Sequence, residues 1–196
     1  MWRWILGILA VVILALVGTC YAGYRRLTTG GTSVAATVPG DPAHVFTLLT
    51  NRDSLLDWLP AGTTAMPERH GTFQPGDTIR VAMPTRTSIP AGRSMQLWIV
   101  REVKSPDVFA IEAIEFDPGG TPHPAFTRRD SVFASGDSTR IVSEFVVTPM
   151  LSRMDPAAAA NASGGVTGSL LSSADKLRVG AARLMWQNQL QRLGRR

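Results

Sequence analysis

The strongest constraint on this chain is an uncharged segment of 21 residues, Trp4 to Tyr24, which lies between Arg3 and Arg25. A helix needs about 20 apolar residues to cross a bilayer, because every backbone amide must find its hydrogen-bond partner inside the segment. The aromatic rings of Trp4 and Tyr24 at the two ends match the aromatic belts of membrane spans. We therefore predict a transmembrane anchor over residues 1–24.

Two other interpretations of this segment stay open. A cleaved signal peptide normally has an apolar region of about 7–15 residues, which is shorter than the segment here. Cys20 is the only cysteine and would suit a lipoprotein, but Thr19 stands before it, where a lipobox has Gly, Ala or Ser. The basic residues on the two sides of the segment balance, so they do not set its orientation in the membrane. The very short N-terminal flank favours an extracytoplasmic domain. We expect a single-pass protein of the cell membrane.

The rest of the chain divides into a linker over residues 25–32 and one domain over residues 33–196, which is long enough for a real hydrophobic core. The formal net charge of +5 belongs to residues 172–196, where six basic side chains accompany one acidic residue, Asp175. Nucleic-acid binding needs a basic face with aromatic or groove-reading elements, and this is only a terminal cluster. We expect no nucleic-acid partner, while contact of the cluster with anionic lipid stays open.

The domain opens with a strand and two short helices. Residues 33–38 form a strand candidate, after which Asp41 is a good N-cap and Pro42 suits the first helical position. Asn51 ends this helix, and a second short helix is predicted over residues 53–59.

Antiparallel strands and one long helix make up the remainder. Alternating apolar residues and turn signals predict strands over residues 78–83, 95–103, 108–116, 126–134 and 139–148. Residues 149–171 are predicted to be a loop, with a loose helical turn at 157–160. Ser172 to Asp175 has the form of a capping box, which predicts a helix of about 20 residues ending at Leu193. This order is typical of an α+β fold in which the long helix covers one face of a curved sheet.

Several of these segments carry a family resemblance. The run VPGDPAHVF (38–46), the run LLTNR (48–52), the tripeptide WLP (58–60) and the terminal amphipathic helix resemble the START-like superfamily, also called SRPBCC or helix-grip. An anchor followed by such a domain resembles membrane-anchored bacterial members labelled polyketide cyclase/dehydrase-like. Gly40 and Asp41 depart from the pattern, since the family often has Ala and Pro there, and residues 149–171 are longer than the family leads us to expect.

The resemblance implies a curved sheet around the C-terminal helix with an apolar cavity between them. Members bind lipids, sterols, polyketides or other hydrophobic ligands, and a few are cyclases or aromatases. Large aromatic and methionine side chains suit an adaptable apolar pocket, although plain core packing is the alternative for each of them. The candidate lining residues are Trp58, Met83, Trp98, Phe109, Phe126, Met185 and Trp186.

Glu112 is the one weak candidate for a catalytic residue. A carboxyl group that faced the apolar cavity would be desolvated and would be able to act as a general acid or base. The favoured alternative is a cross-strand pair with Arg101 on the solvent face. We expect the same of four charged residues in the last hairpin, as a charged ladder on the exposed face: Arg128, Asp130, Arg140 and Glu144.

The histidines indicate no metal site, because His44, His70 and His123 lack a second ligand at metal-binding spacing. We also expect no cofactor. The sequence therefore favours a membrane-tethered protein that binds a hydrophobic small molecule or lipid. Two alternatives stay open. One is a cyclase- or dehydratase-like enzyme with a cavity acid, and the other is an interaction module that uses the basic C-terminal helix on lipids or a partner.

Overall fold

The computed structural model describes most of the predicted domain. The described residues are 18, 32–59, 62–67, 70–84, 93–117, 119–149, 152, 154, 159–161 and 163–193. The predicted anchor and linker therefore lie outside the described residues, apart from Gly18 and Thr32. Within the described part of the chain, no helix is both long and apolar enough to cross a membrane.

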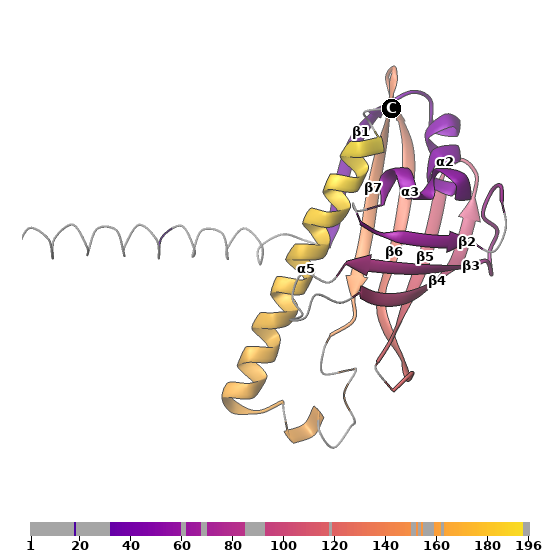
Figure 1. Ribbon diagram of the computed structural model, residues 1–196. Helices are drawn as coiled ribbons and strands as arrows, with labels where there is room; N and C mark the ends of the chain where they lie inside the picture. The colour runs from indigo at the N-terminus through magenta and orange to yellow at the C-terminus, as the bar shows by residue number, and fades with distance from the viewer. Residues whose placement is uncertain are drawn as a thin grey trace, which may run out of the picture.

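Seven strands form one curved antiparallel sheet (Figure 1). The spatial order is β1-β7-β6-β5-β4-β3-β2. The bounds are β1 (Ser33–Pro39), β2 (Thr64–Pro67), β3 (Thr78–Pro84), β4 (Arg93–Lys104), β5 (Val108–Phe116), β6 (Pro122–Ser135) and β7 (Ser138–Val147). The predicted α+β class is confirmed, and so are the strands predicted from residue 33 onward. Among the strands in the described residues, the sequence missed β2, a four-residue edge strand whose terminal proline is tolerated because an edge needs fewer ladder hydrogen bonds.

The first helices follow the predicted caps. They are α2 (Pro42–Thr50), the 3-10 turn η1 (Arg52–Ser54) and α3 (Leu55–Trp58). The Asp41 side chain accepts a hydrogen bond of 2.9 Å from the backbone N–H of His44, which satisfies one free amide of the first turn. Gly40 has a φ of 104°, a left-handed conformation that favours glycine and accounts for its presence at this corner.

The C-terminal helix α5 (Gly165–Leu193) is longer than predicted. It ends at Leu193 as expected, but it begins at Gly165, so the capping box predicted at Ser172 is wrong. Residues 165–171 contain no proline to stop a helix, and their glycines and serines only weaken it. The turn expected at 157–160 has a counterpart in helical residues 159–161.

Helices α2, α3 and α5 cover the same face of the sheet, which we call the inner face. Helix α2 packs on β5, β6 and β7, whereas α5 packs on β1, β7 and α3 (Figure 1). Strand alternation turns every second side chain toward these helices. In β5, for example, Phe109, Ile111 and Ala113 are buried, and the residues between them face outward. The buried residues of α5 that meet this face include Trp186, Leu190 and Leu193.

The two sides of α5 should respond differently to the same substitution. Leu190 is fully buried and Leu184 is 51% exposed. We expect Leu190→Ala to lower the free energy of unfolding by about 2–5 kcal/mol, because it removes apolar contacts and leaves a cavity. Leu184→Ala is the matched control and should change it by about 0.5 kcal/mol or less. Urea unfolding of the full chain in detergent, followed by circular dichroism, measures both. Equal losses would contradict the packing of α5 described here.

Candidate functional site

Three of the predicted lining residues meet between the sheet and α5. Trp98 comes from β4, Phe126 from β6 and Trp186 from α5, and all three are buried. The ring centroids lie 5.7 Å apart for Trp98 and Phe126, and 5.4 Å apart for Phe126 and Trp186. Trp98 and Trp186 are 6.1 Å apart. The three rings thus form one aromatic cluster that joins the sheet to α5.

The other four predicted lining residues do not join this cluster. Phe109 is buried but stacks on Phe73, with centroids 5.9 Å apart. Met83 and Met185 are half-buried and pack against the core. The backbone of Trp58 belongs to α3, and its side chain lies outside the described residues.

A group of polar side chains lies buried on the inner face. We define the interior polar cluster as Arg128 and Asp130 of β6, Ser143 of β7 and Gln189 of α5, all 2% exposed or less. Arg128 Nε donates a hydrogen bond of 2.9 Å to Asp130 Oδ1, which also accepts from the Ser143 hydroxyl. Arg128 Nη1 donates to Gln189 Oε1 at 3.4 Å. The Arg128 guanidinium also lies 4.2 Å from the centre of the Trp186 ring, so the polar and aromatic clusters are in direct contact.

This arrangement corrects the expectation of an exposed charged ladder in the last hairpin. Arg140 and Glu144 are exposed as expected, but Arg128 and Asp130 point inward. The reason is strand alternation, because Arg128 and Asp130 share their face with Phe126 and Val132, which are both buried. The same alternation is visible in the sequence, and it was the signal that could have predicted that Arg128 and Asp130 are buried.

The interior polar cluster has hydrogen-bonding capacity that the described residues do not use. Asp130 Oδ2, an acceptor, and Gln189 Nε2, a donor, are buried and have no hydrogen-bond partner among the described residues. Leaving such an atom without a partner costs about 1–3 kcal/mol. A hydroxyl group both donates and accepts hydrogen bonds, so one hydroxyl would be able to donate to Asp130 Oδ2 and accept from Gln189 Nε2. The cluster therefore suits recognition of a polar group in an otherwise apolar interior.

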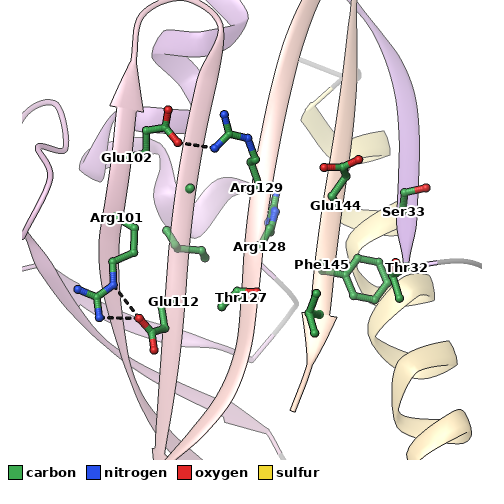
Figure 2. Close-up of a pocket in the computed structure, with 13 residues that line it drawn as sticks. Thr32, Ser33, Arg101, Glu102, Glu112, Thr127, Arg128, Arg129, Glu144 and Phe145 are labelled. Carbon is green, nitrogen blue, oxygen red and sulfur yellow. Dashed lines mark hydrogen bonds and ion pairs between the residues drawn. The ribbon is translucent and has the colours of Figure 1, made fainter. Parts of the chain in front are cut away.

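A second feature is an open depression of about 630 Å³ on the outer face of the sheet (Figure 2). Four of the charged side chains that line it are paired across strands. Arg101 Nε donates to Glu112 Oε2 at 2.7 Å, and Arg129 Nη1 donates to Glu102 Oε2. These pairs are 29–55% exposed, and exposed pairs contribute only about 0–1 kcal/mol each. Arg101 and Arg129 each bind a glutamate and Glu144 adds a further negative charge, so the depression offers little to attract an anionic ligand.

Glu112 occupies this outer face and not the interior. Its neighbours in β5, Ile111 and Ala113, are buried, so alternation turns the Glu112 carboxylate away from α5. The Arg101–Glu112 pair is the alternative that the sequence favoured. This position excludes Glu112 as an acid on the inner face.

Comparison with known proteins supports the fold and nothing finer. No known protein family and no curated protein matches the chain. A solved structure of the KanY protein matches at 14% identity with a TM-score of 0.53, over 85% of this chain and 95% of that one. A conserved protein of Geobacillus kaustophilus matches at 12% identity with a TM-score of 0.53, over 83% and 91%.

A third solved structure, a protein from Nitrosomonas europaea, matches at 12% identity with a TM-score of 0.52, over 84% of this chain and 92% of that one. Identities this low show a shared fold alone. The chain therefore has the architecture of these proteins, an antiparallel sheet with a long C-terminal helix.

The buried ion pair leads to an asymmetric prediction. Asp130→Leu should lower the free energy of unfolding by about 3–5 kcal/mol, because it leaves the Arg128 charge buried without its carboxylate. The double substitution Arg128→Met/Asp130→Leu should restore stability to within about 1 kcal/mol of the unsubstituted chain, or exceed it. Urea unfolding of the full chain in detergent measures both.

The outer-face pair supplies the control. Glu112→Leu breaks an exposed pair and should cost about 1 kcal/mol or less. If Asp130→Leu cost no more than Glu112→Leu, the Arg128–Asp130 pair would not be buried as described.

Proposed function

We propose that this protein binds a hydrophobic small molecule or lipid between the sheet and α5, and that its N-terminal segment holds it at the cell membrane. The observation that carries the proposal is the pair of buried atoms without partners, Asp130 Oδ2 and Gln189 Nε2, in the described part of the interior. They belong to a polar cluster that contacts the aromatic cluster through Arg128 and Trp186.

The packing of an apolar core does not account for a buried polar cluster of this kind. Replacing a buried ion pair by apolar residues of similar volume is often neutral, or it stabilises the fold by about 1–4 kcal/mol. Stability alone therefore does not favour the Arg128–Asp130 pair over apolar side chains. A ligand with an apolar body and a hydroxyl, or a similar donor and acceptor group, accounts for both halves of the site. The body would leave water, at roughly 25 cal/mol per Å² of apolar surface. Its polar group would satisfy the two free atoms.

The resemblance to the START-like superfamily supports the same proposal. That superfamily places hydrophobic ligands between a curved sheet and the C-terminal helix, and we propose that this chain is a helix-grip member of the polyketide cyclase-like kind. We favour binding over catalysis, because Glu112 lies on the outer face and the interior acid Asp130 is held by Arg128 and Ser143.

The test is extraction of the full chain, purified in detergent from expressing cells, with organic solvent and mass spectrometry. We expect a hydrophobic compound in the extract that is absent from detergent alone. Arg128→Met/Asp130→Leu should lower its amount about tenfold, because one lost hydrogen bond of about 1.4 kcal/mol changes an equilibrium tenfold.

The matched control removes the same kind of pair from the outer face. Arg101→Met/Glu112→Leu should leave the extracted amount unchanged. An extract with no enriched compound, together with no shift in melting temperature across a panel of lipids, would refute ligand binding.

A further inference from the structure

The two charges of the interior polar cluster cancel each other. Arg128 and Asp130 form an ion pair in which each side chain is 1% exposed or less. Among the other charged side chains in the described residues, only Arg52 is also buried, and it binds Asp77 of the segment before β3. The cluster is therefore electrically neutral. A charged group brought beside it would remain without a counter-ion in an interior that excludes water, which is costly.

The hydrogen bonds within the cluster determine which of its atoms stay open. Asp130 Oδ1 accepts from Arg128 Nε at 2.9 Å and from the Ser143 hydroxyl, whereas Asp130 Oδ2 has no partner among the described residues. Gln189 Oε1 accepts from Arg128 Nη1 at 3.4 Å, which orients the amide and leaves Nε2 as the open donor. The cluster thus offers one open acceptor on a carboxylate and one open donor on an amide.

The open carboxylate oxygen sets the stricter requirement for a ligand. It can only accept, so the partner of Asp130 Oδ2 must carry an O–H or N–H group. An ether or an ester has neither and leaves this oxygen buried without a partner, which corresponds to binding that is weaker by about 5- to 150-fold. A sulfate or an ionised carboxylate also has no proton to donate, and its charge is repelled by the Asp130 carboxylate.

We propose that Asp130 selects the head group of the ligand, and that the ligand is a neutral amphiphile whose buried polar group carries an O–H or N–H, as in an alcohol or a primary amide. Anionic lipids, and analogues without that proton, are rejected. Such a group replaces a water molecule at the cluster without loss of a hydrogen bond, whereas an ether does not. The inference rests on the proposed function, because it concerns the ligand held between the sheet and α5.

The substitution Asp130→Asn should reverse this selection. The amide oxygen of the new side chain still accepts from Arg128 Nε, which can only donate, so the amide nitrogen takes the place of Oδ2. The open acceptor thereby becomes a second open donor, and the Arg128 guanidinium loses its carboxylate. Both changes favour an anionic head group that only accepts hydrogen bonds.

The test offers the full chain in detergent several head groups on the same apolar body. Hexadecanol, hexadecyl methyl ether and hexadecyl sulfate form one series, and a 3-hydroxy steroid with its methyl ether and its sulfate repeats the comparison on a rigid body. The members of a series are added in equal amounts, and gel filtration removes the unbound compound. Mass spectrometry then measures what the chain retains relative to detergent alone. We expect the alcohol to be retained about tenfold or more over the ether and over the sulfate.

Two variants with the same chemical change separate Asp130 from other carboxylates. Asp130→Asn should retain the sulfate about tenfold over the alcohol, and it should no longer distinguish the alcohol from the ether. Glu112→Gln, in the exposed pair with Arg101, is the matched control and should keep the preference of the unsubstituted chain. Circular dichroism checks that both variants are folded. If Asp130→Asn does not fold, the preference of the unsubstituted chain decides by itself.

The other outcomes separate this inference from the proposed function. Equal retention of the three head groups, or an unchanged preference in folded Asp130→Asn, overturns the role of Asp130 and leaves hydrophobic binding intact. If neither body is retained, the compounds extracted from expressing cells decide. Neutral compounds with an O–H or N–H group support the inference, whereas anions or compounds without such a group overturn it. An extract with no enriched compound refutes the proposed function and this inference together.

Discussion

The Arg128 guanidinium is the contact on which the interior depends, because it joins three elements at once. It binds Asp130 on its own strand, and through Asp130 it meets Ser143 of β7. It also reaches Gln189 and the ring of Trp186, which are both on α5. The long helix is thus fixed to the sheet by a directional contact as well as by apolar packing. Directional contacts restrict the position of a helix more than apolar packing does, which suits a site that must recognise one group of a ligand.

The structure separates three surfaces with different chemistry. The interior between sheet and α5 combines aromatic rings with polar atoms that lack partners among the described residues. The outer face of the sheet carries paired, exposed charges such as Arg101 and Glu112. The side of α5 that faces away from the sheet carries three exposed leucines, Leu170, Leu177 and Leu184. Of these three surfaces, the interior is the one that combines burial with unused hydrogen-bonding capacity among the described residues.

Local signals predicted the fold well and the site only in part. The cap at Asp41 and the strand predicted over residues 108–116 depend on neighbours in sequence, and both were identified from it. The start of α5 was missed because the residue pattern of a capping box, seen at Ser172, looks the same inside a helix as at its N-terminus. Trp98, Phe126 and Trp186 were each expected to line the site, but their meeting depends on tertiary packing. Arg128 and Asp130 were placed outside because charges are rarely buried, and strand parity proved the better guide.

The most direct test of the central claim is an NMR spectrum of the side-chain amides, recorded before and after the compound extracted from the chain is added back. Gln189 is buried in the interior polar cluster, whereas Gln191, two residues later on α5, is exposed. We predict that the Gln189 amide shifts and exchanges its protons more slowly with the compound bound, while the Gln191 amide does not change. A bound compound that leaves Gln189 unchanged would contradict the claim that the ligand occupies this interior.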